Sequence, residues 1–203
     1  MKGVGTLMAA FGRQYEVRSE TGEILLCVPR GKKSLFACGD RVQVADTGPG
    51  QGVIEKLVER TSLLYRSDAW RQKLIAANAT QVVLVVATEP SFSDEFLSRC
   101  LCAAESQHLK VLIVLNKTDI TAGLAGARQQ LAIFAALGYP ILELSALDSV
   151  DALRARLVGE TSLLVGQSGM GKSTLTPDPL YSRVYDSHPP AAVRIARLEA
   201  AAR

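Results

Sequence analysis

The chain has 203 residues, a formal net charge of +3 and 48% hydrophobic residues. This composition excludes wholesale disorder, and the length allows one domain or two small ones. The longest apolar run is about seven residues, so it is far below the roughly 18–20 that span a bilayer, and we expect no membrane partner. No signal-peptide pattern opens the chain, and its four cysteines form no Cys-x-x-Cys pair. We therefore expect a reducing, cytoplasmic location.

Residues 1–65 are expected to form an all-β domain. Five short, often alternating apolar runs are separated by turn residues, at 4–9, 15–18, 23–28, 41–45 and 52–57. This pattern favours a small barrel of the OB type. Residues 1–73 carry a net charge of +4, and Arg30, Lys32 and Lys33 cluster beside a glycine. A basic small barrel suggests an RNA-binding surface, and a solvated loop that favours solubility is the alternative.

Residues 66–203 are expected to form an α/β domain. The continuous apolar run at 82–87 is typical of a strand that is buried on both faces. Ser93 supplies a helix N-cap, and Gly138 ends a later helix. The predicted strands lie at 82–87, 111–115, 141–144 and 162–165, and the predicted helices at 93–107, 125–137 and 150–157. Alternation of strands and helices favours a parallel sheet.

A phosphate-binding P-loop pattern follows the last of these strands. It consists of Gly166, Gln167, Ser168, Gly169, Met170, Gly171, Lys172 and Ser173, with Thr174 next in the helix. Glycines let the backbone N–H groups wrap around an anion, and the helix N-terminus adds a favourable dipole. Lys172 is placed to bind the terminal phosphates, and the Ser173 hydroxyl is predicted as the Mg²⁺ ligand.

A second motif, Asn116-Lys117-Thr118-Asp119, lies at the end of a buried strand. A carboxylate at Asp119 can accept hydrogen bonds from N1–H and from the exocyclic amine of guanine, a donor pair that adenine lacks. Asn116 would connect this loop to the P-loop, and the stem of Lys117 would stack on the base. The four-residue pattern is weak alone and becomes informative beside a P-loop.

The third motif is Ser145-Ala146-Leu147, whose backbone N–H groups could contact the guanine carbonyl oxygen. Both guanine motifs precede the P-loop, whereas in ordinary GTPases the P-loop comes first. This order indicates a circular permutation of the GTPase domain. Because the sites lie at the carboxyl ends of parallel strands, permutation can leave the pocket intact.

The chain resembles the bacterial circularly permuted, ribosome small subunit-dependent GTPase A family. The similarity covers roughly residues 3–175 and is carried by the stretches 62–66, 73–78 and 166–174. The resemblance implies an OB-type barrel that binds ribosomal RNA, and a GTP/GDP pocket with Mg²⁺ that is stimulated by the small ribosomal subunit. It also implies GTP hydrolysis in small-subunit maturation and a cytoplasmic protein. We expect a monomer.

The sequence departs from this family after the P-loop. Pro177 and Pro179 stand where the P-loop helix should continue, and no Asp-x-x-Gly follows Ser173. The family's zinc-binding domain has no counterpart, since all four cysteines lie upstream. We therefore expect a C-terminally incomplete GTPase domain, without zinc ligands and with catalytic residues unknown. An Ala/Arg-rich helix at 191–203 is expected to cover part of the open edge of the sheet. Alternatively, residues 193–198 resemble the strand that follows the switch segment in the family.

Two alternatives accompany the GTPase interpretation. A module that binds guanine nucleotide and RNA without hydrolysing GTP fits the altered C-terminal region. A P-loop ATPase or kinase of another class explains residues 166–173 but leaves the motif at 116–119 to chance.

Overall fold

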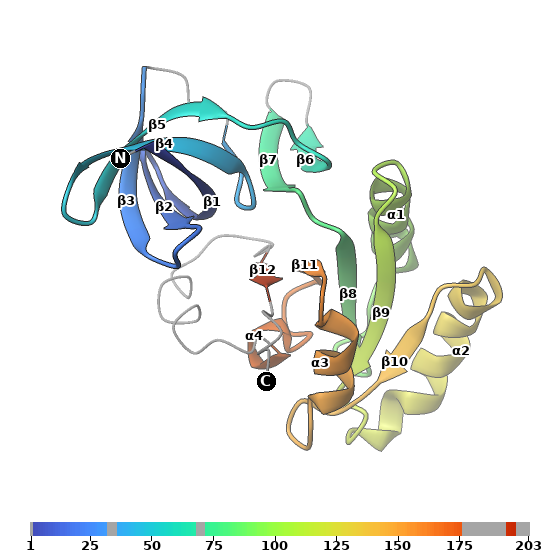
Figure 1. Ribbon diagram of the computed structural model, residues 1–203. Helices are drawn as coiled ribbons and strands as arrows, with labels where there is room; N and C mark the ends of the chain where they lie inside the picture. The colour runs from blue at the N-terminus through green and yellow to red at the C-terminus, as the bar shows by residue number, and fades with distance from the viewer. Residues whose placement is uncertain (1, 32–35, 68–71, 176–193, 198–203) are drawn as a thin grey trace. The chain divides into compact units, whose positions relative to one another are not determined.

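The computed structural model describes residues 2–31, 36–67, 72–175 and 194–197. The chain divides into two compact units, Met1–Ala79 and Thr80–Arg203 (Figure 1). The boundary after residue 65, which the sequence places between the all-β domain and the α/β domain, stays a prediction. In the part of the chain that the structure describes, no helix combines the length and apolar character needed to cross a bilayer.

The first unit contains a closed five-stranded barrel. Its strands are β1 (Lys2–Phe11), β2 (Gln14–Ser19), β3 (Ile24–Pro29), β4 (Arg41–Gly48) and β5 (Gln51–Leu57). They are hydrogen-bonded in the order β1-β2-β3-β5-β4, and an antiparallel β1–β4 pair closes the barrel. Only β3 and β5 pair in parallel among these strands. The architecture is OB-like, which confirms the barrel predicted from the sequence.

Alternate residues of these strands fill the barrel. The buried side chains are Leu7, Tyr15, Val17, Cys27, Val42, Val44 and Ile54. The Phe36 ring meets the Tyr15 ring edge-on, with ring centroids 5.6 Å apart, an arrangement that adds to the apolar burial of both rings. Burial raises the pKa of the Cys27 thiol to about 11, so this cysteine stays protonated and serves as packing.

A two-stranded hairpin that was not predicted from the sequence follows the barrel. It consists of β6 (Leu63–Ser67) and β7 (Gln72–Ala77). Its base is joined to the barrel by Asp40, a fully buried carboxylate. Arg60 donates two hydrogen bonds to Asp40, at 2.7 and 2.8 Å, and the Ala37 N–H donates a third at 2.7 Å. Because the Asp40 charge is paired and hydrogen-bonded, its burial is tolerated. The hairpin lies in the same compact unit as the barrel.

The second unit is built on a five-stranded sheet. Its order is β10 (Ile141–Glu143), β9 (Lys110–Asn116), β8 (Gln81–Ala87), β11 (Thr161–Val165) and β12 (Arg194–Arg197). The first four strands are parallel. Every residue of β8 is buried, as the continuous apolar run predicted. This arrangement confirms the predicted α/β domain.

The helices of this unit are α1 (Asp94–Glu105), α2 (Leu124–Ala136), α3 (Asp151–Leu157) and α4 (Lys172–Leu175), with a short 3-10 helix, η1 (Thr121–Gly123). Right-handed crossovers place α1 and α2 on one face of the sheet and α3 on the other (Figure 1). Ser93 caps α1, since its Oγ accepts a hydrogen bond from the Phe96 N–H. The loops that lead into the helices on both faces therefore lie at the carboxyl edge of the sheet.

The described part of the C-terminal tail, residues 194–197, is a strand and not the expected helix. This strand, β12, is the one that the family resemblance implied, and it pairs antiparallel with β11, from Thr161 opposite Arg197 to Leu164 opposite Arg194. An unpaired strand edge leaves backbone N–H and C=O groups without partners, and a strand satisfies them where a helix cannot. The rest of the predicted tail helix, at 191–193 and 198–203, lies outside the described residues.

Candidate nucleotide-binding site

The three sequence motifs meet at the carboxyl edge of the parallel sheet. The P-loop follows β11, the motif at 116–119 ends β9, and the motif at 145–147 follows β10. Loops at this edge of an open α/β sheet form the usual ligand crevice. The topology alone therefore brings these segments together.

Asn116 connects all three motifs. Its side chain is 1% exposed, its Nδ2 donates to the Met170 carbonyl at 3.0 Å, and its Oδ1 accepts from the Ala146 N–H at 3.0 Å. The sequence predicted the link to the P-loop, and the structure adds the link to Ala146. A buried amide that satisfies both neighbouring loops fixes their relative positions.

The glycines of the P-loop are required by close packing as well as by conformation. A Cβ at Gly166 would overlap the Val85 carbonyl oxygen, and one at Gly171 would overlap the Asn116 amide. Gly171 also has φ +80°, in the left-handed region that favours glycine. Met170, which lies between these two glycines in the sequence, is buried and anchors the loop.

The remaining P-loop residues surround the start of α4. Lys172 Nζ donates to the Gly166 carbonyl, and the Thr174 N–H donates to the Gly171 carbonyl at 3.1 Å. Ser168, Gly169 and Thr174 are exposed. The side chain of Ser173 lies outside the described part of the chain, so its role as Mg²⁺ ligand stays a prediction.

The loop at 116–119 is held in a tight turn. Lys117 has φ +60°, and the Ile120 N–H donates to the Lys117 carbonyl at 3.0 Å. Lys117 Nζ donates to the Glu89 carbonyl at 2.8 Å. The Asp119 side chain is exposed, where a ligand can reach it.

The motif at 145–147 is the outermost of the three. Ser145 is buried and its Oγ accepts from the Leu147 N–H at 3.3 Å. The Leu147 side chain is 81% exposed.

Sequence reasoning missed a fourth segment at this edge, residues 88–93, which we call the bridging segment. It follows β8, the central strand between those that carry the other loops. Its Ser93 N–H donates to Gln167 Oε1 of the P-loop at 3.2 Å, and Lys117 reaches it from the other side. The only signal in the sequence was its place directly after a buried strand.

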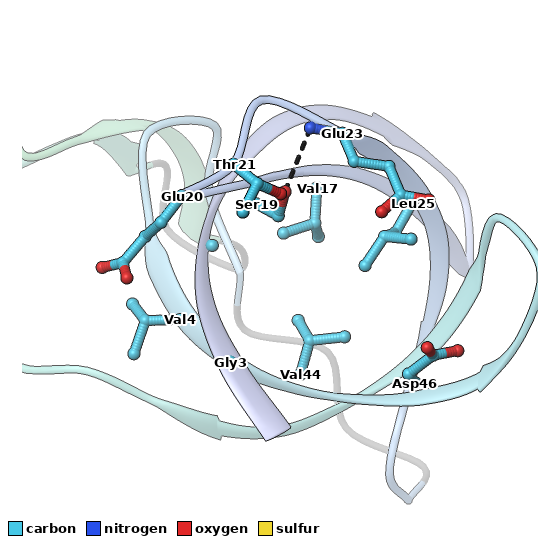
Figure 2. Close-up of a pocket in the computed structure, with 11 residues that line it drawn as sticks. Gly3, Val4, Val17, Ser19, Glu20, Thr21, Glu23, Leu25, Val44 and Asp46 are labelled. Carbon is cyan, nitrogen blue, oxygen red and sulfur yellow. Dashed lines mark hydrogen bonds between the residues drawn. The ribbon is translucent and has the colours of Figure 1, made fainter. Parts of the chain in front are cut away.

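A separate pocket of about 270 Å³ opens in the barrel unit. Figure 2 shows Val17, Leu25 and Val44 directed into the barrel, with Glu20 and Glu23 at the margin. Carboxylates at the margin repel phosphate groups, so this pocket does not suit a nucleotide or an RNA backbone.

No group of three His, Cys, Asp or Glu side chains among the described residues is arranged to hold a metal ion. Burial raises the pKa values of Cys38 and Cys100 to about 11 each. These two thiols therefore stay protonated at neutral pH. The P-loop supplies the kind of groups that a nucleotide phosphate binds, because a glycine-rich backbone directly precedes α4 and Lys172 is its first residue.

A P-loop domain in which the motifs at 116–119 and 145–147 precede the P-loop has the motif order of a circularly permuted GTPase, and here an OB-like barrel comes before it. The sequence model of the family described as RsgA GTPase matches residues 57–181. This chain belongs to that family.

The relatives agree with this assignment. The chain is 54% identical over 171 residues to the small ribosomal subunit biogenesis GTPase RsgA of Nitrosospira multiformis, covering 84% of this chain and 55% of the relative. It is 52% identical over 176 residues to the protein of the same name from Burkholderia pseudomallei, covering 84% and 56%. The chain therefore spans about half the length of the curated relatives it matches.

Two solved structures are similar. YjeQ from Thermotoga maritima superposes with a TM-score of 0.68 at 33% identity, covering 86% of this chain and 64% of that one. YloQ, described as a circularly permuted GTPase, gives a TM-score of 0.63 at 24% identity, covering 86% and 63%. The second likeness concerns the fold alone.

Proposed function

We propose that this chain binds GTP and GDP with Mg²⁺ at the carboxyl edge of its sheet and hydrolyses GTP in small ribosomal subunit biogenesis. The observation that carries the proposal is the pair of hydrogen bonds by which Asn116 joins the P-loop to the motif at 145–147. A phosphate loop held in fixed register with a guanine-recognition loop is what selective binding of a guanine nucleotide requires. The names of the relatives from Nitrosospira and Burkholderia support the same role.

Each motif has a defined task in this proposal. The backbone N–H groups of 166–171 and the Lys172 ammonium bind the phosphates. Asp119 accepts hydrogen bonds from the guanine base, and the stem of Lys117 covers its face. Mg²⁺, held by Ser173, would neutralise phosphate charge during hydrolysis.

Replacing Asp119 tests the base assignment. A carboxylate offers two acceptors to the guanine N1–H and amine, whereas an amide offers one acceptor and one donor. We expect Asp119→Asn to lower GDP affinity about 100-fold, as for loss of a charged hydrogen bond, and to improve binding of xanthosine diphosphate, which carries an oxygen in place of the amine. The change is measured by equilibrium titration with both nucleotides. Unchanged preference for GDP would contradict the assignment.

The barrel is proposed to contact the ribosomal RNA of the small subunit. Its support is the net charge of +4 over residues 1–73, together with the OB-like topology, which commonly binds oligonucleotides. Binding of purified small subunits should weaken as salt rises from 50 to about 200 mM, because counterion release drives such contacts. Binding that is insensitive to salt would oppose an RNA-backbone contact.

We further propose that the protein is a cytoplasmic monomer. Sedimentation equilibrium would test the monomer, and a mass that rises with concentration would contradict it.

A second candidate is a module that binds guanine nucleotide and RNA without hydrolysing GTP. It is favoured by Pro177 and Pro179, which stand where the helix after a P-loop normally continues. Phosphate release in the presence of small subunits separates the two candidates, with Lys172→Ala as the control for contaminating activity. Release that depends on Lys172 supports the GTPase, and release no faster than in the control supports the inert module.

A further inference from the structure

Thr88 makes a contact that none of the three motifs accounts for. It is the first residue of the bridging segment and is 8% exposed. Its Oγ1 donates to the Lys117 carbonyl at 2.9 Å, and its backbone N–H donates to the Asn116 carbonyl at 3.3 Å. Thr88, directly after β8, therefore holds two consecutive carbonyl groups of the loop at 116–119, those of Asn116 and Lys117.

The loop that Thr88 holds has an unfavourable backbone conformation. Lys117 lies at φ +60°, a region that non-glycine residues occupy at a cost unless their surroundings fix them there. The hydroxyl of Thr88 binds the carbonyl of this same residue. The bond therefore opposes relaxation of the loop at the position that carries the Lys117 side chain and lies two residues before Asp119.

Thr88 is itself fixed in place. A Cβ at Gly123, at the end of η1, would lie 2.9 Å from the Thr88 carbonyl oxygen, closer than packed atoms tolerate. Gly123 thus lets the start of α2 approach Thr88 directly. With one neighbour on each side, Thr88 has little freedom to move away from the loop.

We propose that Thr88 is a positioning residue for base recognition: its hydroxyl fixes the loop at 116–119 and so sets the preference for guanine over adenine nucleotides. This inference rests on the proposed nucleotide-binding function. Thr88 contacts no base in this account and acts through Lys117 and Asp119. Loss of its hydroxyl should therefore affect nucleotides that use the base contact and spare those held by their phosphates alone.

The chain offers a matched control at the other end of the same strand. Thr80 immediately precedes β8, as Thr88 immediately follows it. Thr80 Oγ1 donates to Glu160 at 2.5 Å and accepts from the Thr161 N–H at 2.9 Å. Thr80→Val removes hydroxyl hydrogen bonds from the same unit, at the edge away from the motifs.

The test is equilibrium titration of the full chain with GDP and with ADP, in the presence of Mg²⁺, for the unchanged protein and for Thr88→Val, Thr88→Ala, Thr88→Ser and Thr80→Val. We expect Thr88→Val and Thr88→Ala to reduce the GDP-over-ADP preference about tenfold, through weaker GDP binding at constant ADP binding. The Lys117 carbonyl then keeps the Ile120 N–H as a donor but loses the Thr88 hydroxyl, which holds it to the end of β8. Thr88→Ser should keep the preference within about twofold because the donor remains. Thr80→Val should lower the unfolding temperature without changing the preference.

The outcomes separate a positioning role from a structural one. A purely structural Thr88 would lower stability and leave the GDP-over-ADP preference intact in both the valine and the alanine variants, which would overturn the inference while the proposed function stands. The alanine variant keeps the comparison available if the valine variant does not fold. An unchanged protein with no preference for GDP would overturn the proposed function and this inference with it.

Discussion

The two edges of the parallel sheet differ in backbone conformation and in the contacts that hold them. At the carboxyl edge, Lys117 adopts φ +60° and glycines at 166 and 171 stand where any Cβ would overlap a neighbour. At the amino edge, Glu160 accepts from Lys110 and from Thr80, both at 2.5 Å. One edge holds loops in a conformation that suits a ligand, and the other closes the sheet with satisfied polar contacts.

The comparison shows how one strand serves both purposes. β8 begins after Thr80 and ends before Thr88, and both hydroxyls donate hydrogen bonds within the unit. Strain at functional loops persists only where surrounding contacts impose it. Variants at the carboxyl edge should therefore change ligand binding, and variants at the amino edge should change stability.

The largest effect is expected at the P-loop. Lys172→Ala should weaken GDP binding about 100-fold, because a charge-assisted hydrogen bond to phosphate is lost. Titration with GDP measures the loss, and circular dichroism checks that the variant is folded. Binding within twofold of the unchanged protein would show that the phosphates lie elsewhere.

The next largest effect is expected at Asn116, where one substitution should change both stability and GDP binding. Asn116→Ala leaves the Met170 carbonyl and the Ala146 N–H without their partner, so the free energy of unfolding should fall by about 2 kcal/mol. GDP binding should weaken as well, since the two loops lose their connection. Ser162→Ala is the matched control, because Ser162 is fully buried and donates to Gln81 at 2.7 Å, away from the motifs. Its stability should fall without a change in GDP preference, and equal loss of preference in both variants would argue against a local role for Asn116.

The smallest effect is expected at the amino edge and depends on pH. Hydrogen bonds from Lys110 and Thr80 lower the pKa of Glu160 below its ordinary value of 4.5. The unfolded chain therefore binds a proton at higher pH than the folded chain does. The stabilisation is present above pH 4.5 and disappears as the pH falls through the lower, folded pKa.

Glu160→Gln should remove this dependence. The free energy of unfolding at pH 7 should fall by less than about 1 kcal/mol, because Lys110 is largely exposed and solvent screens the pair. Thermal unfolding between pH 3 and 7 measures the change. A variant whose stability falls as steeply as that of the unchanged protein below pH 4.5 would assign the dependence to other carboxylates.

Most of the fold could be predicted from local sequence patterns. The uninterrupted apolar run of β8 and the cap at Ser93 each have a physical meaning that does not depend on distant residues. The barrel and the α/β unit followed from these patterns. The order of the motifs then indicated the permutation.

The missed elements depend on contacts between distant segments. The bridging segment has no distinctive composition and is recognised only because β8 lies between β9 and β11 in the sheet. The hairpin of β6 and β7 is joined to the segment before β4 by a hydrogen bond from the Ala77 N–H to the Cys38 carbonyl, two residues that are far apart in the sequence. The strand at 194–197 replaces the expected helix because the edge of β11 offers it partners.

The central claim is that the carboxyl edge of this sheet recognises a guanine nucleotide. Its most direct test is equilibrium titration of the unchanged protein with GDP and with ADP under the same Mg²⁺ concentration. We predict that GDP binds at least about 100-fold more tightly, since the hydrogen bonds to Asp119 are available to guanine alone. Equal affinity for the two nucleotides would contradict the account.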